Sequence, residues 1–289
     1  MKSKYLILTL IPLLTACSQS DTVETSAGNT PLKVELSAQT RAAITATTLP
    51  DGSAYRIFVT NAEGDSLAER AVSYAQGTST LSQPYMLNSE VRHIYAAYTG
   101  TNYSLGFPDM FISSSTQTDY LFGAARTSDG DIADINEDNY VAHIRLDHAM
   151  AQIRFRVTRS EDNDEACFVG DVFMEGIQTQ GYLNIVSGKL DLLDNIGTVY
   201  TKNAFYASPT SSTDIDMLVV PQYRDFLYVH FNIDGQDRLV LIPEITLEAG
   251  NVYVYTVLIQ NRGRLEVSEV EILPREEGEG GSYVIPYAQ

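Results

Sequence analysis

The sequence predicts an all-β protein whose strands form sandwiches. Short runs rich in Val, Ile, Thr and Tyr recur along the 289 residues, separated by clusters of Gly, Asn, Asp and Pro, which is the pattern of strands and turns. Apolar residues at helical spacing do not persist for more than about two turns. No long helical segment separates the strand candidates, which argues against parallel βαβ units.

Residues 1–16 predict a secretory signal peptide rather than a structural element. Lys2 and Lys4 precede a short apolar run that ends in small residues, whereas a membrane-spanning helix needs about 20 apolar residues. Residues 13–17, Leu-Leu-Thr-Ala-Cys, resemble the lipobox of bacterial lipoproteins. This resemblance implies that Cys17 becomes the new N-terminus and carries the lipid. A lipid with two or more acyl chains would attach the protein stably to a membrane. An ordinary signal peptide that happens to contain a cysteine is the alternative.

A flexible tether and then a strand are expected next. Residues 17–30 are small, polar and without apolar periodicity, as a tether between lipid and fold would be. Residues 31–37, Pro-Leu-Lys-Val-Glu-Leu-Ser, alternate strictly. This pattern places Leu32, Val34 and Leu36 on one face of a half-buried strand.

We expect a first domain over residues 31–138. Its further strands are expected at residues 54–60 and 92–98, and a short helix is possible at residues 65–74. Pro108 interrupts the apolar run of residues 105–112, which favours an edge or loop there. An acid-rich loop at residues 128–138 precedes a long apolar run, and we place the domain boundary at its end.

A second domain is expected over residues 139–289. After the run of residues 140–158, seven strand candidates follow at residues 168–178, 181–184, 216–220, 226–233, 238–243, 251–260 and 265–272. Asp234-Gly235 lies between two of them and is a hairpin signal. Seven strands at this spacing favour a sandwich.

Three segments of the second domain resemble the fimbrillin family, the Mfa-like subunits of type V pili on Bacteroides-type bacteria. They are residues 144–157 (IRLDHAMAQIRFRV), 218–222 (LVVPQ) and 247–256 (LEAGNVYVYT), and they match in place and order. Residues 119–125 (DYLFGAA), Thr40-Arg41 and the lipobox add to the resemblance. The sequence departs from the family at Leu273-Pro274, where family members often carry a Trp.

The resemblance implies two transthyretin-like or immunoglobulin-like antiparallel sandwich domains, export as a lipoprotein and assembly by strand exchange. In the family an arginine-specific protease removes an N-terminal strand, and Arg41 is the matching site here. A sandwich that lacks one strand accepts an extended peptide. Before the cut, Leu32, Val34 and Leu36 would fill that groove, which stabilises the fold by about 5–9 kcal/mol before ordering costs.

The donated strand is expected at the other end of the chain. Residues 280–289 follow an acidic, Gly-rich stretch, and Tyr283, Ile285 and Tyr287 alternate within them. Pro286 suits an added strand at a sheet edge. A frayed terminus without a role is the alternative.

Composition excludes several classes of function. Acidic residues outnumber Lys and Arg by 37 to 19, and loss of Lys2 and Lys4 with the signal peptide takes the net charge from −18 to −20. Nucleic acid is therefore not an expected partner, because phosphate binding needs clustered cations.

No enzyme, metal site or cofactor is expected. His143 and His148 lie five residues apart on a strand and should point to opposite faces, and the loop at residues 129–134 departs from a calcium-binding pattern. Cys167 lacks a partner for a disulfide if Cys17 is acylated.

The expected function is that of a fimbrial subunit at the cell surface. Its partners would be other fimbrial subunits, the outer membrane through the lipid, and a surface ligand of host or bacterial cells. The alternative is a surface glycan-binding lipoprotein, for which four aromatic residues close in sequence could stack on sugar rings: Tyr95, Tyr98, Tyr103 and Phe107. Core packing is the competing explanation of these aromatics.

Overall fold

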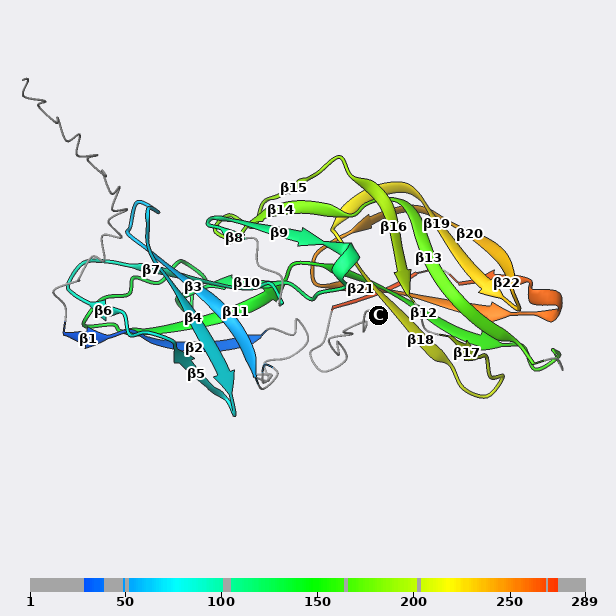
Figure 1. The fold of residues 1–289 in the computed structure, drawn as a ribbon, viewed down its shortest axis with the longest axis horizontal. Helices are drawn as coiled ribbons and strands as arrows, with labels where there is room; N and C mark the ends of the chain where they lie inside the picture. The colour runs from blue at the N-terminus through cyan, green and yellow to red at the C-terminus, as the bar shows by residue number, and fades with distance from the viewer. Residues whose placement is uncertain are drawn as a thin grey trace, which may run out of the picture.

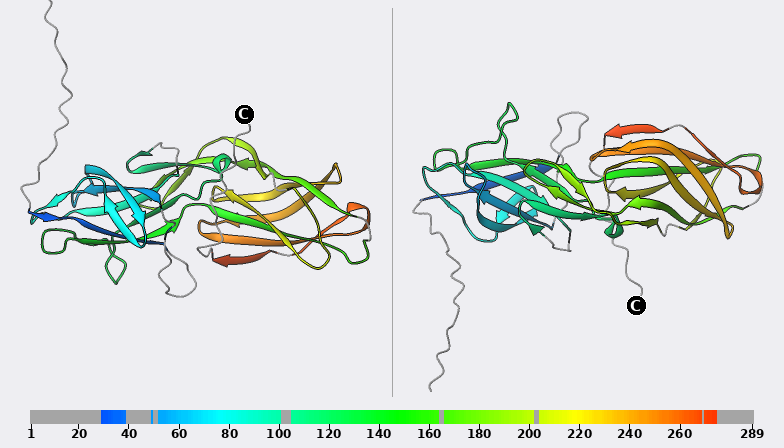
Figure 2. Two further views of the ribbon diagram at one scale, coloured as in Figure 1. Left: turned by 60° about the horizontal axis from the view of Figure 1, so that its bottom comes forward. Right: turned by 90° about the horizontal axis from the view of Figure 1, so that it is seen from above.

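The computed structural model describes residues 29–38, 49, 52–100, 105–163, 166–201, 204–268 and 270–274. These residues form an all-β structure with two short 3₁₀ turns, η1 (Ser114–Thr116) and η2 (Asn261–Gly263). The molecule is elongated, with the blue and cyan strands in one half and the yellow and red strands in the other (Figure 1; Figure 2). None of the described helices has the length and apolarity that crossing a bilayer requires.

A seven-stranded sheet forms the first half. Its strands, in spatial order, are β2 (Lys33–Ala38), β11 (Val141–His148), β10 (Leu121–Ala124), β7 (His93–Tyr98), β3 (Ser53–Thr60), β4 (Ser66–Ala75) and β5 (Thr78–Leu81). The sheet curls until its two outer strands, β2 and β5, approach each other. The concave side encloses one apolar core, which includes Tyr55, Ile94 and Ile144.

A second, four-stranded sheet covers the convex side. It contains β8 (Leu105–Gly106), β9 (Asp109–Ser113), β14 (Gln180–Asn184) and β15 (Leu190–Leu192). Phe58 and Tyr95 of the large sheet pack in one cluster with Ile112 and Leu183 of this cover sheet. The strands β14 and β15 follow β13 in the chain, so the second half of the sequence returns to complete the first half of the structure.

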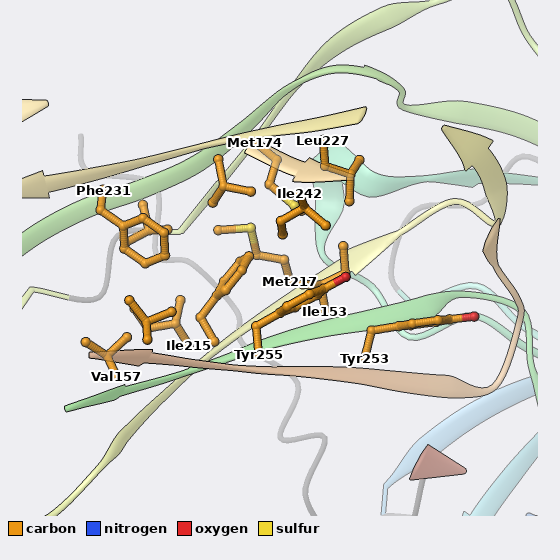
Figure 3. Close-up of a cluster of buried hydrophobic side chains, with 14 of the residues drawn as sticks. Ile153, Val157, Met174, Ile215, Met217, Leu227, Phe231, Ile242, Tyr253 and Tyr255 are labelled. Carbon is orange, nitrogen blue, oxygen red and sulfur yellow. The ribbon is translucent and has the colours of Figure 1, made fainter. Parts of the chain in front are cut away.

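The second half is a sandwich of two further sheets. One sheet has the order β18 (Thr213–Val219), β12 (Ala151–Arg159), β21 (Asn251–Ile259) and β22 (Leu265–Val267), and β23 (Glu271–Pro274) also pairs with β21. The other has the order β16 (Ile196–Thr201), β13 (Phe168–Gln178), β19 (Gln222–Ile233) and β20 (Gln236–Leu247), and β17 (Phe205–Tyr206) pairs with β13. Figure 3 shows aromatic and aliphatic side chains of both sheets meeting between them, among them Phe231 and Tyr255.

The division between the two halves differs from the predicted one at residues 138 and 139. β11 belongs to the first sheet and β12 to the second half, so the chain crosses over at Ala149-Met150. The acid-rich loop that suggested the boundary joins β10 to β11 within one sheet. Its composition therefore marks a solvated connection rather than a domain linker.

The predicted helix at residues 65–74 is wrong, because β4 occupies this segment. Its Leu-Ala-Glu-Arg-Ala sequence has helical propensity. However, β4 pairs along its length with β3 and also with β5, and Val72 and Tyr74 reach the core at the spacing of a strand. Tertiary pairing overrides local propensity here.

Among the described strands, two pairs are parallel and the other pairs are antiparallel. β2 runs parallel to β11, and β12 runs parallel to β21. Alternation of apolar residues is the same in both orientations, so the sequence could not distinguish them.

Candidate functional site

The N-terminal strand β2 closes the first sheet and is the centre of the candidate site. On one side it forms a parallel ladder with β11 in the register Lys33↔Val141 to Ala38↔Leu146. On the other side it meets β5, where the backbone N–H of Leu36 donates to Ser79 Oγ at 3.3 Å. β2 thus lies between β11, with which it pairs, and β5, the strand at the other end of the curled sheet.

The residues just before β2 are also tied to the body. β1 (Thr30–Pro31) pairs with β6 (Met86–Leu87), and the N–H of Leu32 donates to the Tyr85 carbonyl at 2.9 Å. The N–H of Lys33 donates to the Tyr140 carbonyl at 2.9 Å. The backbone of this segment is therefore paired on both flanks rather than laid loosely on the surface.

The three side chains singled out from the sequence occupy one row in the first core. Leu32, Val34 and Leu36 are 5%, 4% and 7% exposed, and all three belong to the cluster on the concave side of the sheet. Their removal from water accounts for about 5–9 kcal/mol before ordering costs. Without β2, the core would be open to solvent along one side.

The opposite face of β2 is polar. Lys33 Nζ lies 2.6 Å from Glu35 Oε1, and His143 Nδ1 of β11 lies 3.0 Å from Glu35 Oε2. The hydrogen bond from Lys33 lowers the pKa of the Glu35 carboxyl below its usual range, and the charges of Lys33 and His143 act in the same direction. The contact between Glu35 and His143 joins β2 to β11 on this exposed face.

The family-like motifs meet at the junction of the two halves. His148 Nδ1 lies 3.0 Å from Asp119 Oδ1, which joins the DYLFGAA segment to the following strand. The N–H of Gly250 in the LEAGN turn donates to the Met150 carbonyl at 3.0 Å. Gln222 of the LVVPQ segment is buried. Its Oε1 accepts from the Gln178 N–H, and its Nε2 donates to the Gln178 carbonyl. The described parts of these motifs thus make contacts between segments that are distant in sequence.

Two junction residues were missed in the sequence. Gln117, which follows η1, donates from Nε2 to the Leu218 carbonyl at 2.9 Å and accepts from the Leu218 N–H at 2.8 Å. Ser114 Oγ accepts from the Val220 N–H at 2.9 Å. No local pattern marks either residue, because their partners are more than 100 residues away in sequence.

A tight backbone approach explains the glycine of the DYLFGAA segment. A Cβ placed on Gly123 would lie 2.1 Å from the Arg145 carbonyl oxygen of β11. β10, which contains Gly123, lies between β7 and β11 in the centre of the sheet. Glycine lets β10 approach the strand against which β2 pairs.

Several predicted site residues lie outside the described part of the chain. These are the lipidation site Cys17, the processing site Arg41 and the donor-strand residues Tyr283, Ile285 and Tyr287. β2 ends at Ala38, before Arg41, and β23 ends at Pro274, before the three donor-strand residues.

The histidines and the remaining cysteine are separated from one another. His93, His143, His148 and His230 each face a different carboxylate, from Asp134, Glu35, Asp119 and Asp237 respectively. Within the described ranges, no three His, Cys, Asp or Glu side chains gather as a metal site would require. Cys167 is buried in the second core, and desolvation raises the pKa of its thiol.

The aromatics considered for sugar stacking pack inward where they are described. Tyr95 is 4% exposed, Phe107 stacks on Phe58 with ring centroids 5.1 Å apart, and Tyr98 contacts Tyr55 at 5.2 Å. Tyr103 lies outside the described residues. The three described members of this group therefore do not form an exposed platform.

Comparison with known proteins gives a family and a fold. A family model described as fimbrillin-like matches residues 40–274. No curated protein matched the sequence. Among solved structures, proposed cell adhesion proteins of Bacteroides uniformis and Bacteroides ovatus superpose with TM-scores of 0.65 and 0.64, at 16% and 15% identity, covering 85% of this chain and 99% and 98% of theirs.

A third solved structure carries a fimbrial name. It is the tip fimbrial protein Mfa3 of Porphyromonas gingivalis with a C-terminal truncation, similar with a TM-score of 0.52 and 10% identity, covering 84% of this chain and 99% of that one. At these identities the three structures support the fold alone.

Proposed function

The chain belongs to the fimbrillin-like family, and from this membership together with the placement of β2 we propose that it is an adhesive fimbrial subunit assembled by donor-strand exchange. The carrying observation is that β2, the first strand of the large sheet in chain order, pairs with β11, and that Leu32, Val34 and Leu36 of this segment fill the core. A strand in this position leaves an acceptor groove when it departs.

The first step is a cut after Arg41. β2 is the first strand of its sheet in chain order and ends at Ala38. A cut after Arg41 would therefore break the covalent link between β2 and all the later strands. What then holds β2 is the β11 ladder, the three buried side chains, the hydrogen bond to Ser79 and the pairing of the preceding residues with β6 and Tyr85. Because burial of the three side chains is worth about 5–9 kcal/mol before ordering costs, the cut strand stays in place until an incoming strand replaces these contacts.

The second step is insertion of a strand from another subunit. Departure of β2 exposes the unpaired edge of β11 beside an open apolar core, a combination that favours addition of a strand with alternating apolar residues. Tyr283, Ile285 and Tyr287 have this alternation. In the proposal they come from a neighbouring subunit and occupy the row vacated by Leu32, Val34 and Leu36.

Export and anchoring complete the proposal. Cys17 carries the lipid that holds the precursor at the outer membrane, and the cut after Arg41 releases the mature subunit into the fimbrium. The role is structural and adhesive rather than enzymatic, and the partners are other subunits of the fimbrium and a ligand on host or bacterial surfaces. Membership of the family supports this assignment.

A disulfide that locks β2 to β11 tests the exchange step. Glu35 and His143 are register partners whose side chains meet on the exposed face, so Glu35→Cys with His143→Cys places two thiols within reach. In full-length protein carrying Cys17→Ser, we expect an arginine-specific protease to cut the chain under oxidising conditions without yielding polymers. Reduction should then restore polymers, seen by electron microscopy and as ladders on gels.

The single variant Glu35→Cys is the matched control and should polymerise under both conditions. Polymers that form equally well while the disulfide is closed would show that β2 does not leave the groove. Cleavage at a site other than Arg41 would remove the proposed first step.

A further inference from the structure

A cleft lies at the boundary between the cover sheet and the second sandwich. It has a volume of about 530 Å³ and runs between β15 and the adjoining ends of β19 and β20. Leu190, Leu192 and Pro221 provide apolar lining, while Tyr223, Thr246 and Glu248 provide a ring and polar oxygens. The volume lies within the range of about 300–1,000 Å³ that is typical of small-ligand sites.

Tyr223 is held in a fixed orientation although it is half exposed. Its hydroxyl lies 2.8 Å from Asp225 Oδ1 and 3.0 Å from Glu244 Oε1, and its proton is shared between these two acceptors. These hydrogen bonds raise the pKa of Tyr223 to about 12. Tyr223 is 52% exposed. Because the two hydrogen bonds already fix its side chain, a ligand that stacks on the ring does not have to order a mobile side chain.

The charge of the cleft selects the kind of ligand. Glu248 lines it, and Asp225 and Glu244 lie at the Tyr223 hydroxyl. No Lys or Arg is among the described lining residues. Anionic ligands are therefore repelled, whereas hydroxyl groups find carboxylate acceptors.

We propose that this cleft binds a neutral oligosaccharide, with the apolar C–H face of one sugar ring on Tyr223 and hydroxyl groups donating to Glu248 and neighbouring acceptors. A sugar ring combines an apolar face with hydroxyl donors, and it matches an exposed aromatic ring flanked by carboxylates. The inference rests on the adhesive function proposed above and gives it a ligand class and a site.

Binding of defined oligosaccharides tests this site. Full-length protein with Cys17→Ser is titrated calorimetrically with mannopentaose, xylopentaose, cellopentaose and chitotetraose, and with sialyllactose as the anionic comparison. We expect at least one neutral probe to bind and sialyllactose not to bind. Tyr223→Ala should weaken that binding about tenfold or more through loss of the ring surface, and Tyr223→Phe, which keeps the ring, should weaken it less.

Tyr182→Ala is the matched control. Tyr182 is also an exposed tyrosine, at 44%, but it lies on β14 against Phe111 and does not line the cleft. Its removal should leave binding unchanged. Failure of all four neutral probes, or equal binding by the Tyr223→Ala variant, would overturn the inference.

The same variants separate this inference from the proposed assembly. Tyr223→Ala lies outside the β2 groove, so it should polymerise after cleavage like the parent protein. Polymers without oligosaccharide binding would leave strand exchange standing and remove the carbohydrate site.

Discussion

Leu36→Ala should loosen β2 without disturbing the second half of the molecule. Leu36 is 7% exposed and contributes to the row that fills the first core. Truncating a buried leucine to alanine costs about 2–5 kcal/mol. Because β2 lies at the end of its sheet and its neighbours can relax, we expect the lower part of this range, about 2–3 kcal/mol. This corresponds to a roughly 30- to 150-fold increase in opening of the strand.

Hydrogen exchange measured by mass spectrometry reports this opening. Amides of β11 that pair with β2 should exchange faster by that factor in the Leu36→Ala variant, while amides of β12 and β13 should keep their rates. Lys33→Ala is the control, because Lys33 is an exposed residue of the same strand whose partner Glu35 lies on the polar face. Its effect on exchange in β11 should be minimal.

Two results would refute the reasoning. Unchanged exchange in β11 would mean that Leu36 does not hold the strand in place. An equal increase across β11, β12 and β13 would mean that β2 opens only when the whole molecule unfolds, and a groove could then not be exposed in a folded subunit.

Three further predictions address the scaffold. Gly123→Ala brings a Cβ within 2.1 Å of the Arg145 carbonyl oxygen. It should lower the free energy of unfolding, measured by urea titration, by about 2–3 kcal/mol. Gly106→Ala is the control and should be neutral, because a Cβ there meets nothing within 4 Å. Gln117→Ala removes both hydrogen bonds to the Leu218 backbone and should cost about 2–3 kcal/mol and separate the unfolding transitions of the two halves. Gln76→Ala is the control, because Gln76 and Gln117 both have a positive φ. If the two halves of the Gln117→Ala variant still unfolded in one transition, the hydrogen bonds from Gln117 to Leu218 would not couple them. Burial raises the pKa of Tyr255 well above its usual value, so just above pH 10 its phenol ionises in the unfolded state and not in the folded state, and it contributes a fall in stability of about 1.4 kcal/mol per pH unit there. The raised pKa values of Tyr95 and Tyr223 act in the same direction, so Tyr255→Phe should remove one tyrosine's share of this loss. Tyr228→Phe, at an exposed position, is the control, and an unchanged alkaline profile in Tyr255→Phe would refute the assignment.

Much of the strand pattern could be predicted from the sequence because alternation reports directly which face is buried. Residues 168–178 match β13 from end to end, and the Asp234-Gly235 turn joins β19 to β20 with both residues at positive φ. The buried row of β2 also agrees with its alternation. In each case a short-range pattern determines the local structure.

The arrangement of strands depends on partners that are distant in sequence. The cover sheet pairs β9 with β14 although about 70 residues separate them, and no local signal links the two. β5, which lies beside β2, has the sequence Thr-Ser-Thr-Leu. This segment is short and mostly polar, so its sequence did not predict a strand. Gln117 and Ser114 were missed for the same reason, since a polar side chain gives no sign of the backbone it will bind.

The strands at the two ends of the described fold, β2 and β23, differ in how much they bury. This difference bears on which end is the removable strand and which end is the donor in the proposed exchange. β2 buries three side chains, so its departure opens a core. β23 pairs with β21 over four residues, and Ile272 and Leu273 on it remain 55% and 41% exposed. A chain end held this lightly can extend toward a neighbour without uncovering the core of its own subunit. In the strand exchange proposed above, a subunit that donated its N-terminal strand would have to expose its own first core. The proposal therefore places the acceptor groove at the N-terminal strand and the donor at the C-terminal end, and it predicts that removal of residues 275–289 abolishes polymerisation while leaving the hydrogen-exchange rates of β11 unchanged.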